Sequence, residues 1–174
     1  MRRFILGVLT ALSLGGCLGL PGNLEPVTGF EVDRYMGKWY EIQRLDHSFE
    51  RGLSQVTATY TLQDDGSVKV ENFGVKEDGS EDTIVGKALF QGDPTVGSLK
   101  VSFFGPFFGG YHIVALDKEN YQYAMIAGPS FDFLWILSRT PQLDQEITDM
   151  LLMQAEESGF DLEGLIFVEQ DVAE

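Results

Sequence analysis

The sequence predicts an all-β fold: an eight-stranded antiparallel up-and-down β-barrel with one C-terminal α-helix packed on the barrel. Three observations support it. Turn signals recur at regular intervals, the runs between them alternate apolar and polar residues, and one late stretch changes to helical spacing. The 174 residues include 13 Phe, 6 Tyr and 20 Gly, a composition that favours strands joined by turns over helices.

Turn sequences rich in Gly, Pro, Asp and Asn divide the chain into strand-length runs. They occur near residues 64–67, 77–80, 92–94, 105–106, 117–120 and 128–130. Even spacing with hairpin connections is typical of an up-and-down barrel or a sandwich. The predicted strands are residues 38–46, 55–62, 67–75, 83–91, 98–104, 110–116, 121–127 and 133–139.

The alternation within these strands indicates which side of the barrel is wet. In residues 56–62 the threonines occupy one face and Val56, Ala58 and Tyr60 the other. Residues 99–103 likewise place Lys100 opposite their apolar members. A barrel that spans a membrane has its apolar band outside. Polar side chains on the outer face therefore predict a barrel in water with an apolar interior.

The last part of the chain has a different period. In residues 142–158, Leu143, Ile147, Leu151 and Ala155 recur at helical spacing, and Met150 and Met153 are expected to pack as well. Thr140-Pro141 or Asp144 starts this helix and Gly159 ends it. Residues 165–168 are predicted to form a short closing strand.

Residues 1–16 have the pattern of a signal peptide, with Arg2 and Arg3 before an apolar run too short to span a bilayer. Leu14-Gly15-Gly16-Cys17 resembles the bacterial lipobox, so Cys17, the only cysteine, is expected to be acylated and to anchor the protein in a membrane. The alternative is an ordinary signal peptide with an incidental cysteine. Residues 17–29 are then the lipidated N-terminus and a flexible tether, and residues 30–174 the barrel domain. Leu18 after the cysteine resembles sorting signals for the outer membrane, which would leave the barrel facing the periplasm.

The formal net charge of −15 excludes one class of partner. Phosphate backbones would repel so acidic a chain, and no cluster of Lys and Arg interleaves with aromatic residues. We therefore expect no nucleic-acid partner.

Three motifs in order resemble the lipocalin signature and span nearly all of residues 30–174. They are Gly37-Lys38-Trp39-Tyr40-Glu41-Ile42 in the first strand, Leu116-Asp117 after the sixth, and Ser138-Arg139-Thr140-Pro141 after the eighth. The second motif departs from the usual form around Asp117. The segments 49–52 and 101–111 resemble those of bacterial lipoprotein lipocalins in particular.

The resemblance implies that Gly37, Trp39, Asp117 and Arg139 are structural signature residues rather than catalytic ones. A physical reason connects two of them. The ring face of Trp39 at the closed end of the barrel needs a cover, and the Arg139 guanidinium can stack on it while donating hydrogen bonds to nearby carbonyls.

An eight-stranded barrel is just wide enough to hold a small ligand. The side chains expected to point inward and bind it are Ala58, Tyr60, Val70, Ala88, Phe90, Val101, Phe103, Tyr111, Ile113 and Trp135. The expected ligand is a fatty acid or a lysophospholipid, because about 0.8 kcal/mol per buried CH₂ makes one acyl chain sufficient. The expected function is lipid storage or transport in the cell envelope.

No pattern in the sequence indicates catalysis, a cofactor or a metal site. The nucleophile, zinc and phosphate-loop motifs are absent, and His47 and His112 have no metal-ligand companions in the sequence. His47 is expected in a loop near the mouth and His112 on the wall face opposite Tyr111. Two alternatives remain, a protein-interaction module of the envelope and a lipocalin-like enzyme acting on a lipid. A homodimer is also open.

The Phe-rich segment 103–108 is expected to form a hairpin at the open mouth. Phe107 and Phe108 then either touch a membrane or a partner chain, or fold back over the cavity.

Overall fold

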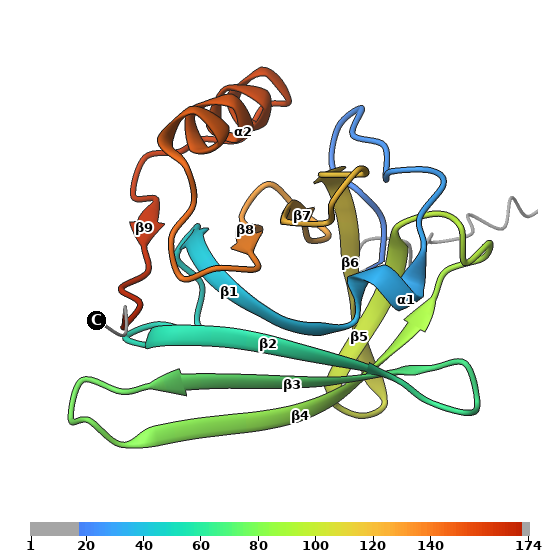
Figure 1. The fold of residues 1–174 in the computed structure, drawn as a ribbon, viewed down its shortest axis with the longest axis horizontal. Helices are drawn as coiled ribbons and strands as arrows, with labels where there is room; N and C mark the ends of the chain where they lie inside the picture. The colour runs from blue at the N-terminus through green and yellow to red at the C-terminus, as the bar shows by residue number, and fades with distance from the viewer. Residues whose placement is uncertain (1–17, 172–174) are drawn as a thin grey trace, which may run out of the picture.

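Nine antiparallel strands and two helices make up the computed structural model, which describes residues 18–171 (Figure 1). The predicted signal peptide and Cys17 lie outside the described residues. The strands are β1 (Gly37–Arg44), β2 (Ser54–Leu62), β3 (Val68–Val75), β4 (Glu81–Phe90), β5 (Ser98–Phe104), β6 (Phe107–Leu116), β7 (Tyr123–Ala127), β8 (Leu134–Ser138) and β9 (Ile166–Phe167). The helices are α1 (Val32–Tyr35) and α2 (Gln145–Glu157). None of the described helices is long and apolar enough to cross a membrane.

The eight long strands form a closed barrel. Each strand from β2 to β7 pairs with its successor, β8 pairs with β1, and β1 pairs with β2 to close the ring. All these pairings are antiparallel, so the prediction of an eight-stranded up-and-down barrel is confirmed. The short β9 continues the sheet beside β1, at Gln43 and Arg44, as the expected closing strand.

The antiparallel order gives the barrel two different ends. The connections after β2, β4 and β6 lie at one end, which α1 and Arg139 cover, and we call it the closed end. The connections after β1, β3, β5 and β7 lie at the other end, the mouth. Local contacts stabilise the turn after β2. Asp65 accepts hydrogen bonds from the backbone N–H and the hydroxyl of Ser67, and Gly66 has a φ of 78°, which glycine adopts readily.

Most strand boundaries differ from the prediction by one to three residues, and two of these differences have a local cause. β6 begins at Phe107 rather than residue 110, because Phe107 already pairs with Phe104 across a tight hairpin. β7 begins at Tyr123 rather than residue 121, because Tyr121 has a φ of 56° and belongs to the preceding turn.

Helix α2 packs against the outer wall, as expected. Its buried residues Leu151 and Ala155 belong to a second apolar cluster with Met125 and Ile136 of the wall. Asp144 is the N-cap, and its side chain accepts a hydrogen bond from Glu146 N at 2.8 Å. The prediction that Met150 and Met153 pack in this interface was wrong. They are 41% and 56% exposed because they lie on the solvent face of the helix.

The segment after Cys17 is docked on the barrel, which corrects the expectation of a flexible tether. Leu18 O accepts hydrogen bonds from His112 Nε2 at 3.0 Å and from Gln91 Nε2 at 3.1 Å. Val27 N donates to Ile113 O and Val27 O accepts from Gly97 N, both at 2.8 Å. Leu20 and Leu24 pack against the second apolar cluster. Apolar side chains and paired backbone groups therefore hold residues 18–27 on the outside of the barrel.

Candidate functional site

The interior of the barrel is the candidate site, and one apolar cluster fills it. All ten side chains predicted to point inward belong to this cluster or pack against it, and so do Trp39 and Phe30. Val70, Ala88 and Ile113 are fully buried, whereas Ala58, Phe90, Val101, Phe103, Tyr111 and Trp135 keep some exposure. The structure thus brings the ten residues together because strand parity places them on one face. That they contact a ligand stays a prediction.

The closed end is sealed by Trp39 and Arg139. The Trp39 ring is fully buried and its Nε1 donates to Tyr35 O at 2.8 Å. The Arg139 guanidinium lies 3.9 Å from the Trp39 ring centre, which is the stacking that the sequence suggested. It also donates to Lys38 O at 2.9 Å and to Arg34 O at 2.7 Å. One side chain therefore joins α1, β1 and the end of β8.

Gly37 and Asp117 occupy turn positions at the same end. Gly37 has a φ of 93°, a conformation that favours glycine, and a Cβ there would lie 3.5 Å from Arg139 Nη1. Asp117 accepts hydrogen bonds from the backbone N–H groups of Glu119, Asn120 and Gln122. It shapes the turn between β6 and β7 and lies outside the interior.

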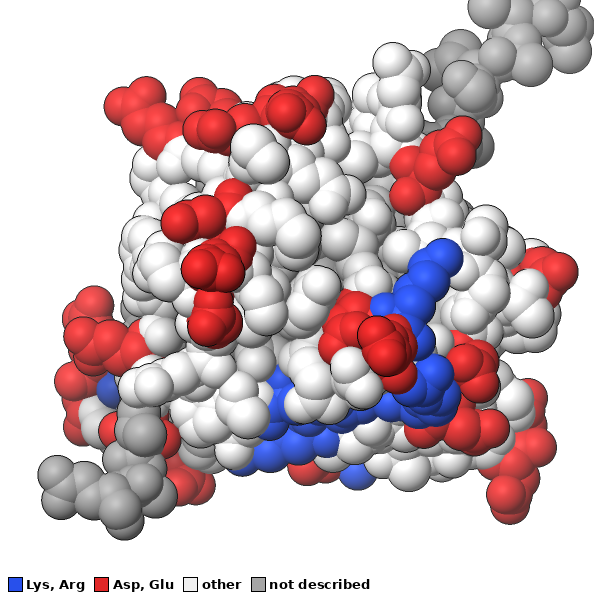
Figure 2. Space-filling model, turned by 45° about the horizontal axis from the view of Figure 1, so that its top comes forward, with Lys and Arg blue, Asp and Glu red and all other residues white. Residues whose placement is uncertain are grey.

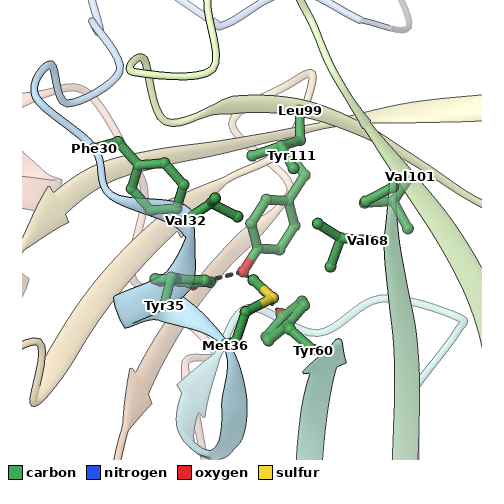
Figure 3. A pocket seen from close by; sticks show the side chains of 10 residues that line it. Phe30, Val32, Tyr35, Met36, Tyr60, Val68, Leu99, Val101 and Tyr111 are labelled. Atoms are coloured by element: carbon green, nitrogen blue, oxygen red, sulfur yellow. Dashed lines mark hydrogen bonds between the residues drawn. The ribbon is translucent and has the colours of Figure 1, made fainter. Parts of the chain in front are cut away.

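Three tyrosine hydroxyls form a chain across the middle of the barrel (Figure 3). Tyr111 Oη lies 2.8 Å from Tyr35 Oη and 2.8 Å from Tyr60 Oη. Burial raises the pKa of all three hydroxyls, so they stay protonated. The residues around them, among them Met36 and Leu99, enclose a cavity of about 10 Å³, which holds about one water-sized sphere. The half of the barrel at the closed end is therefore filled by packed side chains.

The mouth half is not uniformly apolar, which corrects the expectation of an apolar interior. Glu41 and Arg44 are 3% and 1% exposed and form an ion pair of 2.7 Å between Oε1 and Nη1. Arg44 Nη2 also donates to the backbone oxygens of Glu50 and Leu53. Burial raises the pKa of Glu41, and the neighbouring Glu50 raises it further against the effect of Arg44. The buried guanidinium thus ties the β1–β2 loop to the barrel wall.

A second polar contact joins the same loop to β8. Glu50 Oε2 accepts a hydrogen bond from Trp135 Nε1 at 3.0 Å and lies 3.1 Å from His47 Nε2. Burial raises the pKa of Glu50, but the hydrogen bonds from His47 and Trp135 outweigh it and leave that pKa lowered. His47 therefore lies in a loop at the mouth, as expected. Its contact with Glu50 was not predicted from the sequence.

Asn72 is an interior residue that the sequence analysis missed. It pairs with Ala58 and Ile84 across the sheet and so lies on the inward face of β3. Its Oδ1 is buried and has no hydrogen-bond partner among the residues that the structure describes. The signal was available, because Asn72 continues the parity of Val68 and Val70.

The Phe-rich hairpin lies at the mouth, but its exposed residues are not the expected pair. Phe104 and Phe107 are 68% and 80% exposed, whereas Phe108 is partly covered and Lys100 Nζ lies 5.1 Å from its ring centre. His112 lies on the outer wall face, as expected, where its Nδ1 accepts from Ser98 Oγ at 3.0 Å. Phe107 thus points to solvent beside the mouth and does not fold over the cavity.

Comparison with known proteins agrees with this architecture. A family model described as a lipocalin-like domain matches residues 30–170. The Outer membrane lipoprotein Blc of Vibrio cholerae is 50% identical over 169 residues, which are 97% of this chain and 99% of that protein. Its counterpart in Escherichia coli K12 is 51% identical over 151 residues, covering 86% of this chain and 85% of that protein. Insecticyanin from Manduca sexta superposes with a TM-score of 0.69 at 23% identity over 91% of each chain, which shows a shared fold.

The extent of these matches fixes both family and location. The two bacterial relatives are named as outer-membrane lipoproteins, and one of them matches this chain over nearly its whole length. The protein is accordingly placed at the outer membrane through a lipid anchor. On the strength of the family match over residues 30–170 and of half-identical relatives, this chain belongs to the lipocalin family as a bacterial lipocalin.

Proposed function

We propose that the barrel binds one acyl chain, of a fatty acid or a lysophospholipid, and stores or carries it on the periplasmic side of the outer membrane. The observation that carries this proposal is the single interior cluster of apolar and aromatic side chains, which is packed at the closed end and partly exposed toward the mouth. A ligand enters only at the mouth, because Trp39 and Arg139 seal the other end.

The free energy of burial is sufficient for this function. A 16-carbon chain gains on the order of 12 kcal/mol when its methylene groups leave water. The loss of translational and conformational freedom costs several kcal/mol of that gain. Micromolar binding requires about 8 kcal/mol. The balance therefore supports affinity for a long acyl chain and little discrimination between chains.

The geometry also says where the chain would lie. The cavity beneath the tyrosine chain holds about one water-sized sphere, so the acyl chain occupies the mouth half. Ala58, Phe103 and Trp135 do not line that small cavity and are only partly buried. Their side chains, with Tyr111, move apart to admit a ligand. Asn72 would offer its amide to a hydroxyl or carboxyl group of the lipid, because its buried Oδ1 lacks a partner within the described chain.

We assign the protein a binding role rather than a catalytic one. His47 and Glu50 are the mouth's pair of acid–base groups, and Glu50 Oε2 accepts a hydrogen bond from Trp135 Nε1 and lies 3.1 Å from His47 Nε2. The described residues hold no group of three His, Cys, Asp or Glu side chains that could bind a metal ion. The proposed mechanism therefore needs only burial of the acyl chain.

Native mass spectrometry with palmitate and with a lysophospholipid tests the proposal. Ala58→Trp places a large side chain in the mouth half, whereas Thr59→Trp adds the same side chain on the outer face of the same strand. We expect a lipid adduct on the original protein and on Thr59→Trp, and a severalfold smaller adduct on Ala58→Trp. Urea unfolding of both variants checks that the barrel is intact. Absence of any adduct on the original protein, with no change in its Trp fluorescence on addition of fatty acid, would contradict lipid binding.

A further inference from the structure

The wall formed by β5 and β6 differs in charge from the rest of the chain. No Asp or Glu occurs between Asp93 and Asp117, and residues 25–174 contain no longer interval without one. Lys100 is the only Lys or Arg in that interval, and burial lowers the pKa of His112. In a protein with a net charge of −15, an anionic lipid surface would repel this wall far less than the acidic faces.

The same wall holds the chain immediately after the lipid anchor. Leu18 directly follows Cys17, and Leu18 O is hydrogen bonded to His112 of β6. The backbone of Leu18 lies so close to Gly110 that a Cβ there would meet Leu18 O at 3.0 Å. Leu18, the residue that follows the expected lipidation site, is thus held beside the outer face of β6.

The hairpin at the end of this wall presents an exposed apolar tip. Phe104 and Phe107 are 68% and 80% exposed, and Gly105 and Pro106 between them carry no charge. Gly110 is three positions after Phe107, and at about 3.3 Å per residue the tip lies roughly 10 Å along the strand from the docked Leu18. The anchor and the tip are near enough to reach one membrane surface together.

The side of the molecule that carries helix α2 has the opposite character. Every charged residue from Asp144 to the C-terminus is acidic. Figure 2 turns the top of the Figure 1 view toward the reader and shows acidic side chains spread over that face, with most of the basic ones in its lower part. Repulsion from anionic lipids therefore orients the helix away from the membrane.

We propose that the hairpin tip, Phe104 to Phe107, inserts into the same leaflet that holds the acyl chains of Cys17, so that the barrel mouth opens at the membrane surface. The proposal rests on the lipid anchor at Cys17 and not on the identity of the bound lipid. The tip needs little affinity of its own, because the anchor keeps it at a high local concentration near the leaflet. Its function is to set the orientation, which places the entrance of the barrel where acyl chains leave the membrane.

The chain allows a clean labelling experiment. Cys17 is the only cysteine and the expected acylation consumes its thiol, so an introduced cysteine is then the only reactive thiol. Gly105→Cys places a label between the two phenylalanines, where a Cβ meets no other atom within 4 Å. Met153→Cys places the same label on the exposed face of α2 as a control. The full-length acylated protein is incorporated in vesicles of phosphatidylethanolamine and phosphatidylglycerol, with a polarity-sensitive fluorophore on the thiol.

Lipids that carry a quencher below the headgroup then report contact. We expect severalfold stronger quenching and a blue-shifted emission for the label at position 105, and neither at position 153. Adding Phe104→Ser and Phe107→Ser to the Gly105→Cys protein should abolish most of that quenching. Phe167→Ser, which removes an equally exposed phenylalanine on β9, should leave it unchanged.

Other outcomes would overturn the proposal. Equal quenching at positions 105 and 153 would contradict the orientation. A blue shift without quenching that appears only when a vesicle carries several copies would mean that the tip contacts a second copy instead. Flotation of the protein with the vesicles tests the lipid anchor separately. A protein that does not float has no anchor, which would overturn the proposed orientation but would not affect the proposal that the barrel binds lipid.

Discussion

Replacing Arg139 with alanine removes at once the cover of the Trp39 ring and three hydrogen bonds at the closed end. The guanidinium lies 3.9 Å from the Trp39 ring centre. It donates to Lys38 O, Arg34 O and Tyr121 O at 2.9, 2.7 and 3.2 Å. No other described side chain joins α1, β1 and the β6–β7 turn in this way.

The expected loss follows from these contacts. A half-exposed cation–π contact is worth about 1 kcal/mol. Hydrogen bonds from a charged donor contribute about 1.5 kcal/mol each, but water reaches the partly exposed Arg139 and replaces part of that. We therefore expect Arg139→Ala to lower the free energy of unfolding by about 3 kcal/mol. In a chain of this length that corresponds to a fall in Tm of roughly 6–12 °C.

Urea unfolding followed by Trp fluorescence measures this loss, because Trp39 is fully buried in the folded protein. Arg139→Lys keeps the charge but loses the planar fork, and should show an intermediate loss. Arg51→Ala is the control, since Arg51 makes only an exposed ion pair with Asp46, which water and salt screen. An Arg139→Ala protein as stable as Arg51→Ala would refute the account of the closed end.

Three further predictions follow from single contacts. Tyr111→Phe removes the middle hydroxyl of the buried tyrosine chain and leaves two hydroxyls without that partner, so it should cost about 1–3 kcal/mol in a thermal melt, whereas Tyr40→Phe on the outer face should be neutral. The pKa of Glu50 is lowered below its ordinary 4.5, so its contribution to stability is present above about that pH and is lost as the pH falls through the folded-state value. Glu50→Gln should flatten that acid loss, and an unchanged pH profile would argue against the His47–Glu50 contact. Asp144→Ala removes the N-cap of α2 and should cost about 1 kcal/mol by urea unfolding, a loss that Gln145→Ala should not share.

The interior side chains were predictable because alternate residues of a strand point to opposite faces, which is a local property of the sequence. In an antiparallel barrel with one wet face, each residue's side is fixed by its place in the alternation. Val70, Ala88 and Ile113 are buried for this reason. The N-cap and the period of α2 are local signals too.

The polar network at the mouth was not predictable in the same way. Glu41 shares the parity of Trp39, which places its side chain inside the barrel. The sequence does not show which group pairs with a carboxylate at such a position. The β1 strand shifts register between Glu41 and Gln43, and this irregularity turns Arg44 inward. The loop that supplies Glu50 closes over both.

The sequence by itself determined the number of strands, the wet and dry faces, the helix and the motifs that identify the family, because these depend on neighbours along the chain. Only the tertiary structure decided the buried Glu41–Arg44 pair, the tyrosine chain and the docking of Leu18 beside the Phe104–Phe107 hairpin. Each of these joins residues far apart in the sequence or depends on where a loop comes to rest. Such contacts depend on how the whole chain packs, and a pattern of neighbouring residues does not predict that packing.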